Sequence, residues 1–288
     1  MALIAGLWLT ARILGLFSLH GAAIADLAFA CALAWSIGRP LVASGNRRNW
    51  FFLPLIIALG AASVAFLMYP SFALAIGLDI VLFVMAVMGG RVIPAFTNSA
   101  IPGAGARRNR FVEYGALGTI LVILFLDALG WHASVAALAG ALLHAARLAL
   151  WTPWKTRGKP ILWILHVSYA WIAVHLLLRG LAGFELVPDM LATHALTVGA
   201  IGGLTIGMMT RTARGHTARP LEVGAGEVTA YVLIQAAAVA RVLLPLVIPG
   251  AYAPLVTASA VLWCAGFALY AVLYWPILSR PRLDGKPG

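Results

Sequence analysis

Charged side chains are scarce in this sequence. Only 10% of its 288 residues are Asp, Glu, Lys or Arg, while 62% are hydrophobic, whereas a soluble domain carries about a quarter charged residues. The shortage excludes an ordinary soluble protein. The apolar residues form continuous runs of about 20 residues, long enough to cross a bilayer core as a helix, and they do not alternate as barrel strands do. We therefore expect an all-α, polytopic transmembrane helix bundle that forms a single integral membrane domain over residues 1–288.

Cysteine and sequence motifs of catalysis are also scarce. Cys31 and Cys264 both lie inside apolar runs, so we expect two buried thiols and no disulfide framework or thiolate metal cluster. The sequence has no CxxCH, HExxH, Walker or Gly-x-Ser-x-Gly motif, and whether the chain is an enzyme stays open. The first apolar run lacks a preceding basic segment, so we expect no cleavable signal peptide.

The apolar runs predict ten membrane spans, with both termini in the cytoplasm. The spans are expected at about residues 2–18, 21–43, 50–69, 71–92, 111–130, 132–152, 160–180, 187–210, 224–248 and 252–278. Basic residues gather in every second connection and at the end of the chain, and the positive-inside rule places these segments in the cytoplasm. The net charge of +11 therefore reflects membrane topology, and we expect no nucleic-acid partner.

Ionisable residues inside spans each cost roughly 2.5–3.5 kcal/mol at mid-membrane, so each needs a partner or a function. Arg12 and Asp26 lie on consecutive antiparallel spans at similar depth, which predicts an ion pair. The sequence identifies no partner for Asp79, Asp127 and Arg241, and we expect helix-to-helix hydrogen bonds for them.

Two stretches combine glycine with basic residues. In MGGRVIPAFTNSAIPG (88–103), the glycines, Arg91 and Pro94 indicate either a simple helix end or a broken helix around a buried polar ligand. In His194–Pro220, residues Ala195, Gly199, Gly203 and Gly207 recur every four positions. This stripe indicates a helix-packing seam or a surface for a flat ligand.

Four histidines form two pairs by depth. His144 and His166 are expected near the cytoplasmic side, and His175 and His194 near the periplasmic side. Neutral imidazole is a common ligand of metals and haem, so several buried histidines on adjacent helices favour such a cofactor over isolated hydrogen bonds. His194 and His216 are about 33 Å apart in one helix at 1.5 Å per residue, so they cannot share a metal, and His175 is the first candidate partner of His194.

Basic and aromatic residues near these histidines suit a haem as well. Arg91, Arg147 and Arg211 are candidates to pair with propionates. Tyr169, Trp151 and Trp171 are candidates to pack on a macrocycle.

Three stretches resemble the NnrS family: MGGRVIPAFT (88–97), ARLALWTPWKTRGKPILWILHVSYAW (146–171) and HALTVGAIGGLTIGMMTRTARGHTARPL (194–221). WLTARILGLF near the start and YVLIQAAAVARVLLPL (231–246) are similar to it as well. The resemblance implies a multi-pass protein of the bacterial inner membrane that contains haem and copper and is linked to nitric oxide, denitrification and nitrosative stress. Family members usually begin with two further helices carrying a WHAHEM-like motif, which has no match here, so a metal site built on that motif would be incomplete.

Within these stretches we predict His166 and His194 as metal or haem ligands. Further cofactor-binding residues are predicted at His144, His175, His216, Arg91, Arg211 and Tyr169. The expected partners are the lipid bilayer and respiratory or denitrification membrane proteins. Two other functions stay open: a transporter or export component for a small anion or metal complex, since broken helices and intramembrane charges serve such a path, and an assembly subunit of a respiratory complex.

Overall fold

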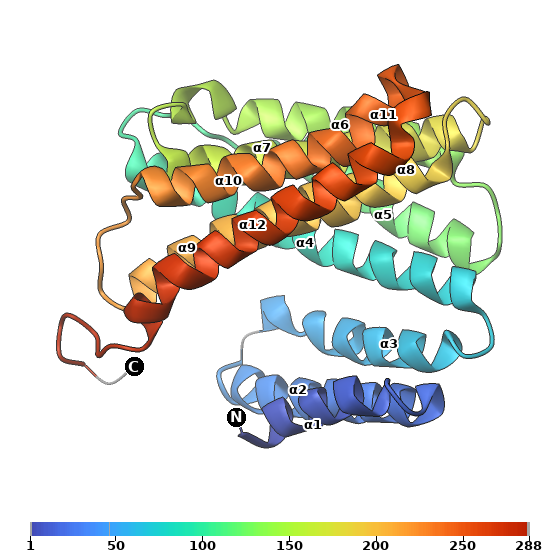
Figure 1. Ribbon diagram of the computed structural model, residues 1–288, viewed down its shortest axis with the longest axis horizontal. Coiled ribbons are helices and arrows are strands. Elements are labelled where there is room, and N and C mark those ends of the chain that lie inside the picture. Colours follow the sequence, from blue (N-terminus) through green and yellow to red (C-terminus); the bar gives the residue numbers. More distant parts are fainter. Residues whose placement is uncertain (1, 46, 287–288) are drawn as a thin grey trace. The chain divides into compact units, whose positions relative to one another are not determined.

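A computed structural model describes residues 2–45 and 47–286, and all the regular structure in these two ranges is helical (Figure 1). The α-helices are α1 (Ala2–Leu14), α2 (Leu19–Ala43), α3 (Phe52–Ala65), α4 (Pro70–Ala100), α5 (Arg110–Ala128), α6 (Ser134–Leu150), α7 (Pro160–Ala182), α8 (Asp189–His194), α9 (Gly202–His216), α10 (Ala225–Ala238), α11 (Leu244–Val247) and α12 (Tyr252–Leu278). Short 3-10 segments are η1 (Arg47–Asn49), η2 (Pro153–Thr156) and η5 (Pro249–Ala251), and π-helical segments are η3 (Ala195–Ile201) and η4 (Val239–Leu243).

The helices account for the ten predicted spans. Eight helical segments of the described chain are long and apolar enough to cross a membrane, and two shorter apolar helices, Leu3–Leu14 and Ser134–Leu150, supply the first and sixth spans. Several spans combine consecutive elements, as where α8, η3 and α9 form one helical segment over Asp189–His216. The all-α, polytopic membrane fold is thus confirmed.

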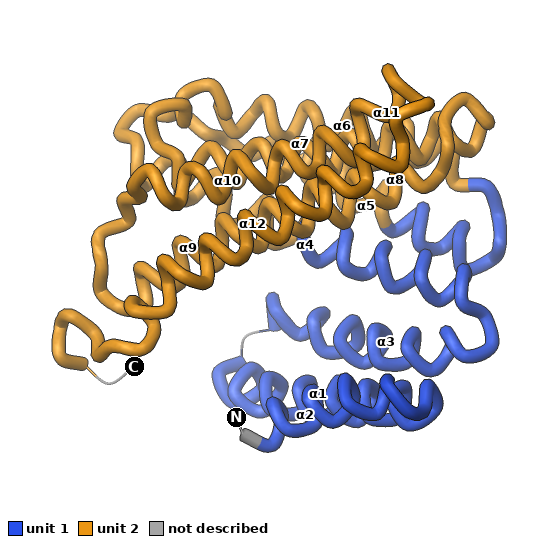
Figure 2. Tube along the Cα trace, in the orientation of Figure 1, with its two compact units in different colours: residues 1–85, 121–132 blue, residues 86–120, 133–288 orange. Residues whose placement is uncertain are grey.

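The chain divides into two compact units (Figure 2). Unit 1 comprises residues 1–85 and 121–132, and unit 2 comprises residues 86–120 and 133–288. Helices α4 and α5 therefore each contribute to both units. The candidate residues of the MGGR stretch and of the histidine pairs all belong to unit 2.

Unit 1 contains the ion pair predicted from helix depth. Helix α2 packs against both α1 and α3, and Arg12 on α1 donates a hydrogen bond to the Asp26 carboxylate on α2. Close packing of α2 on α3 depends on Gly60, because a Cβ there would lie 2.6 Å from the Cβ of Ala30. The prediction for Arg12 and Asp26 is confirmed.

Helix α7 is the most buried span of unit 2. It begins with Pro160 at its first turn, a position where the missing N–H costs no hydrogen bond. About two-thirds of the residues in its most apolar stretch are buried, and the helix packs against α6, α8, η3 and α9. Most of the α7 surface is covered, and His166, Tyr169 and His175 lie on its buried sides, whereas Val167 and Leu177 are exposed.

Helix α4 does not break at its glycines or at Pro94. The interpretation as a broken helix is wrong, because α4 continues as helix to Ala100, eight residues past the approximate end predicted for the fourth span. A proline inside a helix removes one backbone hydrogen bond and crowds the carbonyl four residues earlier, and here that earlier residue is Gly90. The helix accommodates this local loss, and the residues after Pro94 stay helical.

The small-residue stripe is a packing seam against α7. A Cβ at Gly199 would overlap Trp171, one at Gly203 would overlap Ser168, and one at Gly207 would lie 2.8 Å from Leu165. These three partners all lie on α7. A four-residue step slightly overshoots the 3.6-residue turn of an α-helix, and the wider turns of the π-helical segment η3 offset that drift. The helix-packing interpretation is confirmed.

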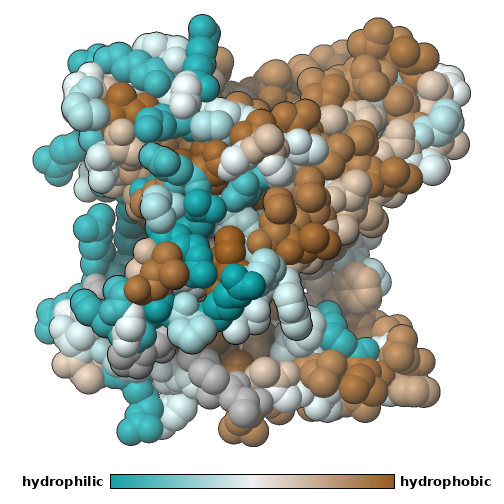
Figure 3. Space-filling model, turned by 60° about the vertical axis from the view of Figure 1, so that its left-hand side comes forward, coloured by the Kyte–Doolittle hydropathy of each residue, from teal (hydrophilic) through white to brown (hydrophobic). Residues whose placement is uncertain are grey.

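The two cysteines do not occupy the protein core. Both thiols are exposed on the protein surface, so the expectation of buried thiols is wrong. An apolar run in a membrane helix can face lipid as readily as protein, because lipid tails are as apolar as leucine. Figure 3 shows that hydrophobic residues cover much of the visible surface.

Candidate functional site

A buried polar cluster lies in unit 2, where α4, α5, α6 and α7 meet. Its centre is Arg147 on α6, whose side chain is 1% exposed. Two guanidinium nitrogens bind Glu113 on α5, with Nε 2.9 Å from Oε1 and Nη2 2.6 Å from Oε2. The third nitrogen, Nη1, donates to the carbonyl of Ala86 and to the hydroxyl of Tyr169, both at 2.7 Å. A planar guanidinium matches a carboxylate in this two-bond geometry, so the charge of Arg147 is fully paired.

Hydrogen-bond donors and acceptors in the cluster fix the protonation of His144. The Tyr169 hydroxyl accepts from Arg147, so its single proton is free to donate to His144 Nδ1, 2.7 Å away. Nδ1 is then an acceptor, and the neutral ring carries its proton on Nε2. Nε2 donates to the carbonyl of Ala116 at 3.1 Å. Both nitrogens of His144 are therefore used by protein groups.

Two glycines of α4 make room for this cluster. A Cβ on Gly90 would overlap the Arg147 guanidinium, and a Cβ on Gly89 would lie 2.9 Å from the ring of Tyr169. The Trp151 ring also packs against the ring of Tyr169, and the two ring centroids are 4.6 Å apart. The paired glycines of the MGGR stretch thus serve side-chain packing within an unbroken helix.

The cluster links four helices and leaves little of its chemistry available to a ligand. Arg147, Tyr169 and His144 direct their polar atoms at one another, at Glu113 and at backbone carbonyls. A haem propionate at Arg147 would have to displace Glu113. The predicted cofactor roles of Tyr169 and His144 stay predictions, but the geometry gives both residues a packing function.

Glu113 is the member of the cluster that sequence reasoning did not identify. It lies in the first turn of α5, and Arg147 lies in the last turn of α6. These two turns belong to the same membrane side in consecutive antiparallel helices. The depth argument that paired Arg12 with Asp26 would have found this pair as well.

The predicted ligand His166 lies on α7 and is 1% exposed. Its Nδ1 lies 3.0 Å from the carbonyl of Leu162, and its Nε2 lies 3.3 Å from the hydroxyl of Thr97 on α4. The Thr97 hydroxyl also donates to the carbonyl of Ile93 at 2.8 Å. His166 is thus brought close to the MGGR helix, and no hydrogen bond joins it to His144, its predicted depth partner.

In the second depth pair, His175 contacts the backbone of α8 beside His194, whereas the His194 side chain contacts Arg241. His175 on α7 has Nδ1 at 2.8 Å from the carbonyl of Ala192, two residues before His194. His194 Nε2 lies 2.8 Å from Nη2 of Arg241, which also lies over the ring of Tyr252. The partner of Arg241 is therefore a histidine, in keeping with the expected helix-to-helix hydrogen bond.

The remaining predicted site residues are Arg91 on α4 and Arg211 and His216 on α9. Arg91 is half-buried on α4, and His216 is exposed at the last turn of α9. Arg211 on α9 is 8% exposed, and its guanidinium lies 3.8 Å from the ring centre of Phe96 on α4. Its Nη1 is buried without a hydrogen-bond partner in the described part of the chain.

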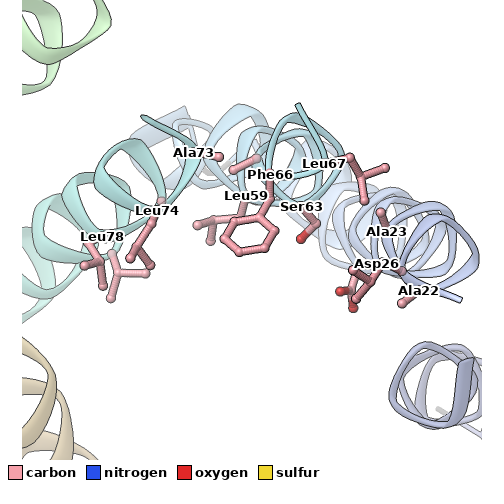
Figure 4. A pocket seen from close by; sticks show the side chains of 14 residues that line it. Ala22, Ala23, Asp26, Leu59, Ser63, Phe66, Leu67, Ala73, Leu74 and Leu78 are labelled. Carbon is pink, nitrogen blue, oxygen red and sulfur yellow. The ribbon is translucent and has the colours of Figure 1, made fainter. Parts of the chain in front are cut away.

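Cavities are found in the described residues of both units. Unit 1 holds one of about 380 Å³ between α2, α3 and α4, where Asp26 and Ser63 add oxygen atoms to an otherwise apolar lining (Figure 4), and one of about 600 Å³ lined by α2 and α3. Unit 2 holds one of about 540 Å³ between the end of α6, η2 and the first half of α7. His166 is the only predicted site histidine in the linings of these three cavities.

The histidines differ in how well they suit a metal. Over residues 2–45 and 47–286, no group of three or more His, Cys, Asp and Glu side chains is arranged to hold a metal ion. A haem iron needs only one or two protein ligands. His175 suits that requirement best, because its Nε2 is buried and has no hydrogen-bond partner among the described residues.

Comparison with known proteins gives one match. A family model described as "NnrS protein" covers residues 1–282 of the chain. No curated protein and no solved structure matches it.

Proposed function

Because the chain belongs to the NnrS family, we propose that it is a haem- or copper-binding membrane protein that takes part in the handling of nitric oxide or nitrosative stress. The family membership and the multi-pass fold are the basis for this proposal. The observation within the molecule that supports it most directly is the state of His175.

One nitrogen of His175 is anchored and the other is available. Nδ1 donates to the carbonyl of Ala192 at 2.8 Å, so the neutral ring keeps a lone pair on Nε2. Histidines that bind metals are commonly held in this way, with the second nitrogen donating to a carbonyl that fixes the ring and raises its basicity. A buried acceptor without a partner costs free energy, and a metal at Nε2 would remove that cost.

A haem or copper at His175 would supply the binding site for nitric oxide, while the protein holds the imidazole and excludes water. His175 is 4% exposed, and the α7 residues Ile172 and Leu176 beside it are fully buried. His175 lines none of the three cavities, so a macrocycle would require neighbouring side chains to move apart, whereas a copper ion needs less room.

The ligands predicted from sequence require larger changes. His194 would have to release Arg241, and His166 would have to give up its contact with Thr97. His194 stays the candidate for a second ligand to a metal at His175, whereas His166 lies nine residues from His175 on α7, on the opposite side of the helix, and cannot share a metal with it. His194 is the nearer in the chain to the Ala192 carbonyl that anchors His175.

Spectra and metal analysis of the purified protein test this proposal. After haem- and copper-replete expression we expect a Soret band or stoichiometric copper that His175→Ala removes. The exposed loop residue His132 provides the control, since His132→Ala should leave both signals unchanged. The cofactor proposal is wrong if the wild-type protein carries neither, or if single substitutions of His166, His175 and His194 all leave the bound metal unchanged.

A role in the cell is tested separately. A strain lacking the gene should grow more slowly than wild type under a nitric oxide donor, and the intact chain should restore growth. Restoration by His175→Ala to the wild-type level would separate the nitric oxide role from the cofactor.

Arg211 favours a second candidate function, the transport of a small anion. Its guanidinium is buried and stacked on Phe96, and it forms no ion pair with any described carboxylate. An unpaired cation in such a place is costly, and a passing anion would offset that cost. Anion flux into proteoliposomes that needs no haem and is abolished by Arg211→Met would favour transport, and absence of flux in the wild-type protein would exclude it.

A further inference from the structure

The cavity of unit 2 has features that neither the family nor the histidine chemistry accounts for. It has a volume of about 540 Å³, is open to the surroundings, and lies between the end of α6, η2 and the first half of α7. Its end at η2 is called the mouth. Its lining consists of Leu148, Pro153, Trp154, Thr156, Arg157, Trp163, His166, Val167 and Ala170.

The charge at its mouth is entirely positive. Arg157 lines the cavity, is exposed, and makes no ion pair with any described residue. Lys155 and Lys159 flank it in the same connection, and no acidic residue contributes to the lining. The mouth therefore complements an anionic group. The positive-inside rule places this connection at the cytoplasmic surface of the membrane. Acidic lipids at that surface attract basic segments of membrane proteins.

The wall of the cavity away from the mouth is apolar and is formed by side chains on the exposed side of α7. Val167 is 41% exposed although it lies in the middle of a buried helix, and Ala170 continues the same side one turn later. Trp154 is 53% exposed at the mouth, and Trp163 lies edge-on to Tyr231 deeper in unit 2. Tryptophan is enriched at the level of lipid head groups, and the cavity passes from a polar mouth at η2 to an apolar wall along α7.

From this gradient we propose that the cavity binds one acidic phospholipid. The phosphate lies at Arg157, and an acyl chain runs along Val167 and Ala170. The charge at the mouth favours an anionic amphiphile over a neutral one such as a quinone, and the apolar wall favours a lipid over free phosphate. The proposed ligand His175 does not line the cavity, and the lipid contacts proposed here, at Arg157, Val167 and Ala170, do not use His166, the one candidate ligand in its lining.

Native mass spectrometry of the purified full chain in detergent tests the proposal. Titration with phosphatidylglycerol and with phosphatidylcholine of the same acyl chains should show tighter binding of phosphatidylglycerol. Arg157→Gln should weaken phosphatidylglycerol binding about five-fold, since a basic residue near an acidic lipid contributes about 1 kcal/mol. Arg280→Gln is the control, because Arg280 is exposed after α12 and lies outside the lining.

A second variant tests the apolar wall. Ala170→Phe fills the cavity and should weaken both lipids, whereas Arg157→Gln should weaken only the acidic one. Because Arg157 is exposed, that variant tests the proposal even if Ala170→Phe fails to fold. Equal binding of both lipids, an equal effect of Arg280→Gln, or a neutral quinone that displaces phosphatidylglycerol would each overturn it. The experiment measures lipid binding and not haem or copper content. A negative result for lipid binding therefore leaves the proposed function untouched, and the absence of haem and copper leaves the lipid proposal untouched.

Discussion

The packing of unit 2 depends on individual residues around Arg147. A guanidinium buried among apolar helices is tolerated because every nitrogen has an acceptor, from Glu113, Tyr169 and the carbonyl of Ala86. Breaking a buried ion pair by removing one partner typically costs roughly 3–5 kcal/mol, whereas replacing both partners by apolar groups costs much less. The cluster therefore lends itself to two tests at the level of single side chains.

Gly90→Ala should destabilise the protein by roughly 3 kcal/mol, because the added methyl group displaces Arg147 from Glu113. The effect is measured by reversible unfolding of the purified protein in detergent micelles. Gly77→Ala on the same helix is the control, since a Cβ there meets nothing within 4 Å and alanine is the better helix former. Equal stability of the two variants would contradict the assigned role of Gly90.

Glu113→Gln should be strongly destabilising, because it leaves Arg147 charged and unpaired in the interior. Adding Arg147→Met to that variant should recover a large part of the loss, since the unpaired charge is then removed. Thermal unfolding of the two single variants and the double variant forms a double-mutant cycle. Additive effects in this cycle would show that the two residues do not interact.

At the scale of elements, the contact of α9 and η3 with α7 is decided by side-chain size. Hydrophobic burial contributes little between helices in lipid, so close approach through small residues is the main source of packing. Gly199, Gly203 and Gly207 allow Trp171, Ser168 and Leu165 to lie against the helix backbone.

Gly203→Ala should loosen this contact, because its Cβ would overlap the Ser168 hydroxyl. Combining it with Ser168→Gly removes the closer of the two overlapping side chains, while Gln235 Nε2 stays 2.6 Å from the new Cβ. The double variant should therefore recover only part of the stability, measured as the temperature at which the protein loses its fold in detergent. Gly215→Ala, where a Cβ meets nothing within 4 Å, serves as the control on the same helix. No difference between Gly203→Ala and Gly215→Ala would rule out a tight seam at Gly203.

The whole molecule is expected to place its basic connections in the cytoplasm. In a variant lacking Cys31 and Cys264, a cysteine introduced at His132 or Leu186 should react with a membrane-impermeant maleimide in intact cells with a permeable outer membrane. A cysteine at Arg107 should react only after the inner membrane is opened. All three positions are exposed, so the reverse labelling pattern would invert the predicted topology.

The sequence by itself determined the spans, because a bilayer demands about 20 apolar residues per helix and composition records that demand directly. It also determined the Arg12–Asp26 pair, because depth along consecutive antiparallel helices can be counted. The sequence also identified the NnrS family, because the motifs that carry the resemblance consist of residues adjacent in the chain.

Tertiary structure decided which polar atoms are used and which are available. The sequence could not show that Gly89 and Gly90 accommodate Arg147 and Tyr169 within an unbroken helix, because these contacts join residues more than 50 positions apart. Nor could it separate His175 from His166 and His194. All three are histidines at suitable depth, but rotation about each helix axis and the neighbouring carbonyls set the direction of each ring, and only in His175 do they leave a buried Nε2 without a partner among the described residues.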